Sequence, residues 1–396
     1  MTNWQSPFAS RSRASRTVPL VFLVLVALAG CSGSTGPSST AVDAAPPAPS
    51  ATPTPGPTGP TPSGRTGPVD AARVQDALAR ILDSDRYRTL VQSVVIQVDG
   101  DVVAEHYADG SGPTVHHNGH SVTKSVMSIL IGIAIADGVI PGVDATLGRL
   151  LPDRTTAMAP GMADVTLEQI LTMTSGLPPD ELFSSRYSAT ADWTAVTLST
   201  ELAQPPGTAF AYTSSGSHLL SAILVRATGR SVLDYAREKL FDPLEIATRP
   251  AADATVDLTL EAYDALPGFA WTVDPTGLHL GFGDLKLTAP DMAKLGRLYL
   301  QNGAWNGRQL VPADWVAAST RGRVDAGANQ YGYQWWVPFA GGHPAFAAFG
   351  LAGQLIEVVP DIGLVVAVSS KRAPAQLDGD AIADQVSTWI VPAVVG

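Results

Sequence analysis

The spacing of apolar residues divides the chain into a helix and hairpin, a helical middle and a strand-rich end. Apolar positions at helical spacing in residues 70–83 predict an amphipathic helix. Two apolar or alternating runs, 92–98 and 102–107, flank Asp99-Gly100-Asp101, which is typical of a β-hairpin. The apolar segment 122–140 then predicts a helix buried in the core.

The middle of the chain, about residues 141–245, shows the spacing of helices separated by turns. Helical spacing recurs in three runs, at residues 166–174, 217–227 and 231–241. The first of these runs opens with Thr-Leu-Glu-Gln, which favours a helix start. We therefore expect a mainly helical section here.

After residue 340 the pattern returns to strands and closes with a helix. The runs 345–349, 354–359 and 363–369 are apolar or alternating, and residues 380–392 are amphipathic. Strand signals thus stand at both ends of the folded part, with helices between them. The economical arrangement is an α+β fold in which both chain ends build one central antiparallel sheet, helices flank it, and a mainly helical subdomain is inserted. Alternating βαβ units are missing, which disfavours a doubly wound parallel sheet.

Residues 1–30 have the composition of an export signal. Three arginines precede the apolar run 17–29, which is shorter than the roughly 20 residues of a membrane-spanning helix. The ending Leu28-Ala29-Gly30-Cys31 resembles a bacterial lipobox, which implies cleavage before Cys31 and lipidation of its thiol. This predicts an exported protein, lipid-anchored to the outer face of the bacterial cell membrane. The alternative is an ordinary secretory signal with an incidental cysteine.

Residues 31–68 are expected to be a disordered linker between this anchor and a folded domain at 69–396. Pro, Ser, Thr, Gly and Ala dominate the linker, so it has too little apolar surface to offset its ordering entropy. Cys31 is the only cysteine of the chain, which excludes an intrachain disulfide. The formal net charge is −11 and there is no basic run outside the signal, so we expect no nucleic-acid partner.

Ser121 and Lys124 form the first candidate for catalytic chemistry. Three residues along a helix place two side chains on one face, about 5–6 Å apart at Cβ. Lys124 is the only basic residue in the apolar segment 122–140, so burial would favour its neutral amine. A neutral amine beside a hydroxyl is a base beside a nucleophile. The alternative, non-catalytic interpretation is that Ser121 caps the helix and Lys124 extends its amine to solvent.

The order of three motifs adds to this pattern. Ser121-x-x-Lys124 is followed by Tyr212-Thr213-Ser214 and then by Ala348-Phe349-Gly350. Together with blocks such as 165–177 and 287–307, they resemble serine hydrolases of the β-lactamase and penicillin-binding-protein type. The likeness is strongest to their class C, esterase and 6-aminohexanoate-dimer-hydrolase-like branch.

The resemblance implies a role for each matching residue. Ser121 would be the acylated nucleophile, Lys124 its base, and Tyr212 the group that carries protons to the leaving group. The backbone N–H groups of Ser121 and Leu351 would form the oxyanion hole. Neither a metal nor an organic cofactor is expected. Further residues are candidates for the lining of the substrate pocket: Ser214, Trp335, Trp336, Phe349 and Gly350. The alternative for the aromatic residues is a position in the core.

Two departures from the family pattern bear on the substrate. Related β-lactamases and peptidases commonly carry Lys-Thr-Gly where this chain has Ala348-Phe349-Gly350, so it lacks a cation for a substrate carboxylate. The residue after Tyr212-Thr213 is Ser214 where many relatives have an asparagine. We expect a neutral ester or amide as substrate. The alternatives are weak β-lactamase or D-Ala-D-Ala peptidase activity, or a silent envelope protein that only binds.

Other polar residues allow competing interpretations. His116, His117 and His120 invite a metal site, but no nearby acid or cysteine completes a ligand set. The run 119–123 nearly matches a nucleophile elbow, which would make a Ser-His-acid triad a distant second mechanism. Asp284 and Asp291 stand near turn or helix starts. For both aspartates we expect a capping role.

Overall fold

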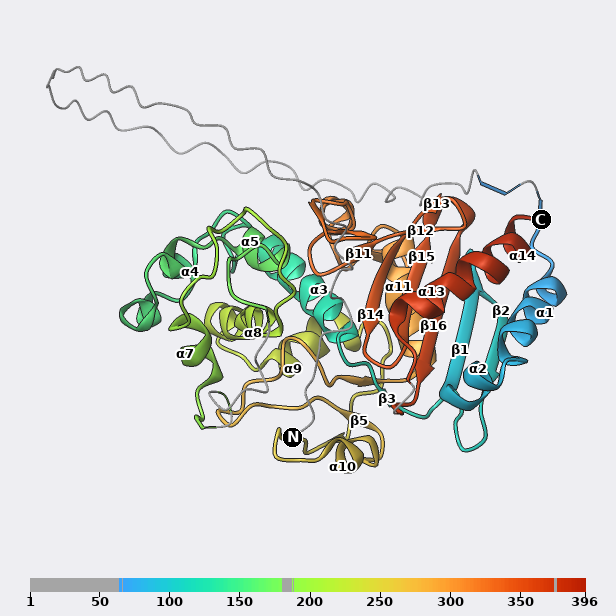
Figure 1. The fold of residues 1–396 in the computed structure, drawn as a ribbon, viewed down its shortest axis with the longest axis horizontal. Helices are drawn as coiled ribbons and strands as arrows, with labels where there is room; N and C mark the ends of the chain where they lie inside the picture. The colour runs from blue at the N-terminus through green and yellow to red at the C-terminus, as the bar shows by residue number, and fades with distance from the viewer. Residues whose placement is uncertain (1–63, 66, 180–186, 188, 374–375) are drawn as a thin grey trace, which may run out of the picture. The chain divides into compact units, whose positions relative to one another are not determined.

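The computed structural model describes residues 64–65, 67–179, 187, 189–373 and 376–396 (Figure 1). The predicted signal, Cys31 and most of the predicted linker lie outside the described residues and stay predictions. Among the described residues, no helix combines the length and apolar character needed to cross a membrane.

An eight-stranded antiparallel sheet forms the centre of the fold, in the order β2-β1-β16-β15-β14-β11-β10-β9. Early strands β1 and β2 pair beside the late strand β16, so both ends of the folded part build the sheet, as predicted (Figure 1). The strands are β1 (Val91–Val98), β2 (Asp101–Tyr107), β9 (Val324–Asp325), β10 (Gln330–Tyr331), β11 (Trp336–Val337), β14 (Phe346–Gly350), β15 (Gln354–Val359) and β16 (Leu364–Ser370).

Both faces of the sheet are buried, which explains why its central strands are apolar throughout. Successive side chains of a strand point to opposite faces. On β16, Val365 and Ala367 join one hydrophobic core, whereas Leu364, Val366 and Val368 join another.

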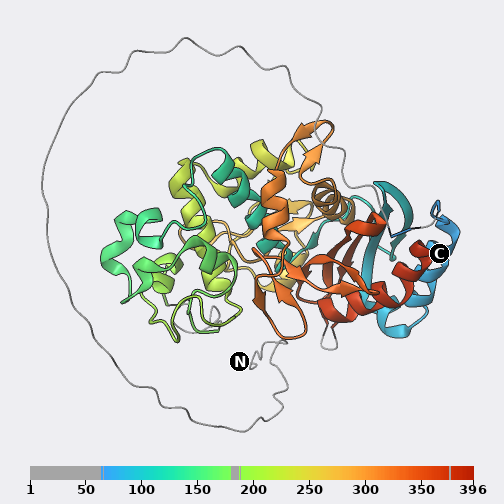
Figure 2. The same cartoon turned by 90° about the horizontal axis from the view of Figure 1, so that it is seen from above.

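Helices cover the two faces. The face that holds Val366 packs against α1 (Ala71–Leu82), α13 (Gly379–Gln385), the π-helical η5 (Val386–Ile390) and α14 (Val391–Val395). The opposite face packs against α3 (Val122–Ala136) and α11 (Ala289–Leu300) (Figures 1 and 2). Asp70 caps α1 by accepting hydrogen bonds from the N–H groups of Ala72 and Arg73.

A mainly helical section follows α3, as predicted. It contains α4 (Leu147–Leu150), η1 (Pro152–Ala157), η2 (Met162–Asp164), α5 (Leu167–Leu171), α7 (Trp193–Leu198), α8 (Ser214–Thr228), α9 (Val232–Ala236) and the π-helical η3 (Arg237–Phe241). A capping box between Thr166 and Gln169 begins α5, which confirms the helix start expected from the sequence. In Figure 1 this section lies beside the sheet half, and α3 runs between the two.

Short elements complete the fold. They are α2 (Asp85–Leu90), β3 (His117–Asn118), β4 (Ala251–Ala252), α10 (Leu260–Asp264), β5 (Phe269–Ala270), β6 (Lys286–Leu287), β7 (Ala304–Trp305), β8 (Arg308–Gln309), α12 (Ala313–Ser319), β12 (Phe339–Ala340), β13 (His343–Pro344) and η4 (Pro360–Ile362). The pairing of β3 with β6 matters for the site, because it joins the segment before α3 to the segment before α11.

Candidate active site

Ser121 occupies the N-cap position of α3, where the chain turns into the helix. Ser121 therefore has the N-cap position expected from the sequence, but its side chain makes no capping hydrogen bond. His120, directly before it, has a φ of +45°, a left-handed conformation that is uncommon for a residue other than glycine. Such backbone conformations persist only where neighbouring structure holds them, and they cluster at functional sites.

Residues 281–285, here called the junction segment, hold this turn in place. The Gly119 N–H donates to the Leu285 carbonyl at 2.9 Å. In return, the Leu285 N–H donates to Thr123 Oγ1 at 3.2 Å, and the Thr123 hydroxyl donates to the His120 carbonyl at 2.7 Å. The position of Ser121 therefore depends on a second segment more than 150 residues further along the chain.

Asp284 contributes to the same contact. Its Oδ1 accepts a hydrogen bond from Asn118 Nδ2 at 2.9 Å and lies 3.6 Å from His120 Nδ1. Burial opposes ionisation of Asp284, but its interactions with His120 and Asn118 outweigh burial and lower the pKa of the carboxyl. The prediction that Asp284 is a helix cap is wrong. For Asp291 it is also wrong: the N-cap of α11 is Thr288, whose Oγ1 accepts a hydrogen bond from the Asp291 N–H at 3.1 Å. Asp291 lies in the first turn of the helix, where its carboxylate accepts from the Thr288 hydroxyl at 2.8 Å.

Lys124 is the most deeply buried charged group at the site, with 1% of its surface exposed. Every residue of α3 from Val122 to Ala134 is buried, so the lysine has no path along the helix surface to solvent. Its Nζ donates to Ser121 Oγ at 3.2 Å, to Ser214 Oγ at 3.1 Å and to the Phe282 carbonyl at 3.0 Å. The structure thus brings the predicted nucleophile and base together, and places Ser214 beside the amine.

Tyr212 lies on the other side of the amine. Lys124 Nζ is 4.8 Å from the centroid of the tyrosine ring, within the range of a cation–π contact. Tyr212 precedes α8 by two residues, and Ser214 opens that helix. One short stretch of chain therefore supplies both the phenol and the second hydroxyl, as the order of motifs suggested.

Leu351 lies at the tip of the β14–β15 hairpin, one residue after Gly350. A Cβ added at Gly350 would lie 2.4 Å from the Gly119 carbonyl oxygen, so only glycine allows β14 to come this close to the turn that carries Ser121. Both Ser121 and Leu351 are partly exposed. Among the backbone hydrogen bonds that the described residues form in turns, loops and helix caps, none has the N–H of Ser121 or of Leu351 as its donor. These two N–H groups are the ones predicted for an oxyanion hole.

Aromatic residues stack beside Tyr212. The Trp336 ring stacks on Tyr212 at 5.9 Å and on Phe349 at 5.8 Å, with interplanar angles of 24° in both contacts. This places two of the predicted pocket residues next to the candidate site. Trp335 differs: its side chain is fully buried against Tyr299 in the core. The prediction that Trp335 lines the pocket is wrong, because a side chain without exposed surface offers no wall to an open pocket.

The sequence analysis missed two residues that hold the site together. The carbonyl of Phe282 accepts from Lys124, and no sequence signal marks a backbone carbonyl for such a role. Gln334 lies between the helices that carry the site residues. Its side chain accepts from Ser217 Oγ of α8 at 2.7 Å and donates to the carbonyls at the end of α5, while its carbonyl accepts from Ser125 of α3.

The three histidines before Ser121 go to different neighbours. His117 Nε2 lies within hydrogen-bond distance of Ser93 and Ser111, and burial lowers the pKa of His117 to about 4. His120 faces Asp284, and the edge of His116 meets Phe269. No group of potential metal ligands occurs within the described residues. The described contacts of Ser121 Oγ are to Lys124 and not to an imidazole, which favours lysine over a Ser-His-acid arrangement.

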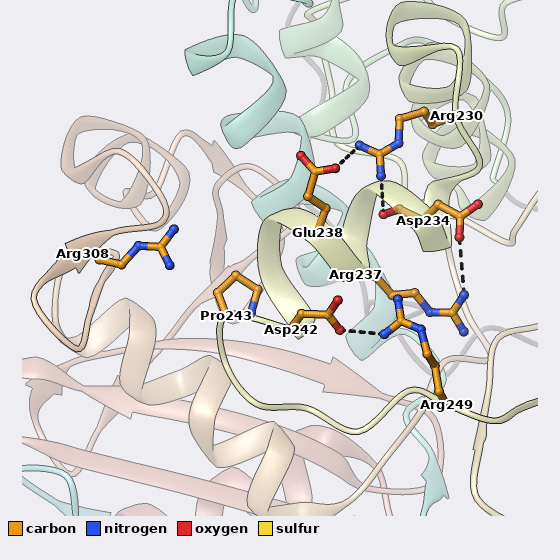
Figure 3. A pocket seen from close by; sticks show the side chains of 8 residues that line it. All are labelled: Arg230, Asp234, Arg237, Glu238, Asp242, Pro243, Arg249 and Arg308. Atoms are coloured by element: carbon orange, nitrogen blue, oxygen red, sulfur yellow. Dashed lines mark hydrogen bonds and ion pairs between the residues drawn. The ribbon is translucent and has the colours of Figure 1, made fainter.

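A charged hollow of about 780 Å³ lies elsewhere, along η3 and near β8 (Figure 3). Its lining comprises Arg230, Asp234, Arg237, Glu238, Asp242, Pro243, Arg249 and Arg308. Three of the arginines already pair with carboxylates of the same lining, as the dashed lines of Figure 3 show. None of the residues around Lys124 belongs to it, so we assign the chemistry to Ser121 and its neighbours.

Comparisons with known proteins agree with this geometry. The family described as Beta-lactamase matches residues 72–387. The chain is 26% identical over 292 residues to the 6-aminohexanoate-dimer hydrolase of Paenarthrobacter ureafaciens, a match that covers 66% of this chain and 68% of that protein. It is 25% identical over 312 residues to penicillin-binding protein 4 of Amycolatopsis lactamdurans, covering 74% of this chain and 79% of that protein.

Solved structures show the same fold. A penicillin-binding protein homologue from Caulobacter crescentus superposes with a TM-score of 0.63 at 20% identity, covering 83% of this chain and 99% of that chain. At this identity the likeness shows the fold alone. The fold expected from the sequence is therefore confirmed.

Proposed function

Because this chain belongs to the Beta-lactamase family of serine hydrolases, we propose that Ser121 attacks a neutral ester or amide and forms an acyl-enzyme. The single observation that carries this proposal is the position of Lys124. A fully buried amine within 3.2 Å of the Ser121 hydroxyl, at the start of a helix, is the arrangement of a base beside a nucleophile.

In the first step Lys124 acts as a neutral amine, whose lone pair faces Ser121 Oγ in place of the third N–H. It takes the proton of the Ser121 hydroxyl as Oγ bonds to the substrate carbonyl carbon. The Ser214 hydroxyl and the Phe282 carbonyl already accept hydrogen bonds from the amine, so the amine keeps its position while its proton count changes. Pre-positioned proton transfer of this kind contributes typically about 10²–10⁴-fold to rate.

In the second step the bond to the leaving group breaks. The proton held by Lys124 passes to the leaving oxygen or nitrogen through Tyr212. The lysine nitrogen lies over the Tyr212 ring, 4.8 Å from its centroid. Water then attacks the acyl-enzyme, gives its proton back along the same route, and releases the acid with Ser121 restored. Every proton taken from serine or water is thus returned to a product or to serine.

The backbone N–H groups of Ser121 and Leu351 would stabilise the tetrahedral oxyanion. In comparable acyl-transfer sites, one such donor contributes about 2.7–4 kcal/mol to transition-state stabilisation. The close approach of Gly350 to Gly119 supports this role, because it fixes the spacing between the two donors.

The side of the site formed by β14 favours an uncharged acyl group. Ala348 and Phe349 are buried and carry no charge, and Trp336 stacks with both Phe349 and Tyr212. A substrate carboxylate would find no cationic side chain among Ala348, Phe349 and Trp336. We therefore propose esters or amides of modest size as substrates, before β-lactams or D-Ala-D-Ala peptides.

The domain is proposed to act at the outer face of the cell membrane, held there by lipidated Cys31 and the linker that follows. The composition of residues 1–68 supports this proposal. Partition of the full-length protein into a detergent phase checks it. Cys31→Ser should move the protein to the aqueous phase, and an unchanged partition contradicts the anchor.

A fluorophosphonate probe and a chromogenic short-chain ester test the catalytic proposal on the full-length chain. The wild type should be labelled and should turn over the ester, and Ser121→Ala should do neither. Ser128→Ala is the matched control, because this buried serine lies two turns further along α3 and its hydroxyl has no hydrogen-bond partner among the described residues. Equal labelling of wild type and Ser121→Ala would exclude Ser121, and faster turnover of a chromogenic cephalosporin than of the ester would make a β-lactam the better substrate.

A further inference from the structure

A buried histidine–aspartate pair contacts the junction segment next to the residue that binds Lys124, and it takes no part in the steps above. His218 of α8 and Asp274 have no exposed side-chain surface, and His218 Nε2 lies 3.1 Å from Asp274 Oδ2. The other carboxylate oxygen, Oδ1, accepts from the Thr276 N–H, the Thr276 hydroxyl and the Leu278 N–H. Burial opposes ionisation of Asp274, but these hydrogen bonds and that of His218 outweigh it and lower the pKa of the carboxyl.

The second ring nitrogen of His218 points to the junction segment. The Gly281 N–H donates to His218 Nδ1 at 3.4 Å, so Nδ1 is a hydrogen-bond acceptor. The ring proton is therefore on Nε2, which donates a hydrogen bond to Asp274. Gly281 also lies tightly against α8, since a Cβ there would come within 2.5 Å of the Ser217 carbonyl and 2.7 Å of Ser221 Oγ. The histidine thus fixes the junction segment to α8 at one point.

The next residue of that segment holds the catalytic amine. The Phe282 carbonyl accepts from Lys124 Nζ at 3.0 Å, and the Phe282 ring lies 5.6 Å from the same nitrogen. The edge of that ring also meets the His218 ring at 5.8 Å, with an interplanar angle of 75°. A continuous path of contacts therefore runs from Asp274 through His218 and Gly281–Phe282 to Lys124.

We propose that His218 and Asp274 are positioning residues, which hold the Phe282 carbonyl so that the Lys124 amine faces Ser121. This inference rests on the proposed function and adds to it. The physical reason is geometric: His218 takes part in two directed contacts, and the one to Gly281 sits one residue from the carbonyl that Lys124 uses. A misplacement of about 1 Å in such an arrangement can reduce rate about 100-fold.

A packing role alone would not require this chemistry. An apolar residue of similar size fills a buried site without the desolvation penalty of a carboxylate and an imidazole. If the pair serves only packing, every substitution of His218 should act through folding stability. If the pair positions the junction segment, the effect should depend on which ring nitrogen is kept.

Two amide substitutions separate the two nitrogens. In His218→Asn the side-chain oxygen can take the place of Nδ1 and keep the bond from Gly281. In His218→Gln the longer side chain can take the place of Nε2 and keep the bond to Asp274. The matched controls are the same substitutions at His343, whose Nδ1 lies 2.7 Å from Asp361. This pair lies at one end of strands β14 and β15, and Leu351 lies at the other end.

The measurement is the rate of fluorophosphonate labelling per folded molecule, with the melting temperature of each variant of the full-length chain. We expect His218→Gln and Asp274→Asn to slow labelling roughly 10–100-fold, to change its pH profile, and to leave KM for the ester nearly unchanged. His218→Asn should stay within about 5-fold of wild type, and both His343 variants should label at the wild-type rate.

Equal slowing in His218→Asn and His218→Gln, or slowing that follows only the loss of folded protein, would overturn the positioning role. So would wild-type labelling in His218→Gln with an unchanged pH profile. If the wild type itself is not labelled and Ser121→Ala behaves like it, the proposed function fails, and the positioning role fails with it. The two failures are thus distinguished by the wild type alone.

Discussion

The central sheet and the surroundings of Lys124 are both buried, and they differ in what fills them. The sheet lies between two hydrophobic cores, and their apolar contacts have no required direction. The region where α3, α8 and the junction segment meet contains Lys124, Ser217, His218 and Gln334, each with directed hydrogen bonds. The first region provides stability, whereas the second provides geometry.

This difference teaches where a substitution should affect folding and where it should affect catalysis. Apolar burial is proportional to area and tolerates small shifts of position. A buried polar network is sensitive to direction, because a donor or acceptor that loses its partner keeps its desolvation penalty. Stability and activity should therefore separate in this molecule, and three substitutions test that separation.

The largest effect is expected for Lys124→Met. Methionine is an unbranched side chain that can fill the buried space of Lys124 on α3, but it cannot accept a proton from Ser121. Labelling by the fluorophosphonate probe should fall by about 10²–10⁴-fold near neutral pH, while the melting temperature stays close to that of the wild type. A collapse of stability with unchanged labelling of the folded fraction would make the lysine a structural residue and remove it from the mechanism.

The reverse result is expected for Ile356→Ala in β15. Ile356 is 1% exposed and belongs to the core between the sheet and α3 and α11. Removal of its branched side chain leaves a cavity, which in comparable cores destabilises by about 2–5 kcal/mol. Chemical denaturation should show this loss, and the labelling rate per folded molecule should stay at the wild-type value. Loss of labelling in the folded fraction would mean that the sheet core also sets the geometry of the site.

The same contrast explains which parts of the fold could be predicted from the sequence. The hairpin of β1 and β2 and the strand β15 have alternating or apolar runs bounded by turn residues, and the structure confirms them within a residue or two. Strands β9, β10 and β11 were missed, because two residues are too few to show a period. The predicted C-terminal helix is present but contains a π-helical turn, Val386–Ile390, which leaves no mark in apolar spacing.

The candidate site follows the same rule. Ser121 and Lys124 were accessible to sequence reasoning because helix geometry alone brings them together. Tyr212, Ser214 and Leu351 were reached only through a resemblance, since they lie far away in the chain. Phe282 and the His218–Asp274 pair were not reached at all. Their roles depend on a backbone carbonyl and on contacts between distant segments, neither of which a local pattern encodes.

The smallest effect tests a buried carboxyl group on the sheet. Glu357 of β15 is 1% exposed, and neither of its carboxylate oxygens has a hydrogen-bond partner among the described residues. Burial, with a smaller contribution from Asp384, raises the pKa of Glu357 from 4.5 to about 8. The folded protein therefore holds this proton more tightly than the unfolded chain does. Its contribution to stability is fully present below about pH 4.5 and is lost as pH rises through about 8.

Glu357→Gln keeps the size of the side chain and removes its ionisation. Between pH 7 and 9 the wild type should lose about 1 kcal/mol of unfolding free energy at this residue, and the variant should lose that much less. Urea unfolding at several pH values measures the difference, with the exposed residue Glu201 as control, since Glu201→Gln should keep the wild-type slope. Equal slopes in all three proteins would show that the Glu357 carboxyl ionises in the folded protein without penalty, which would contradict the raised pKa.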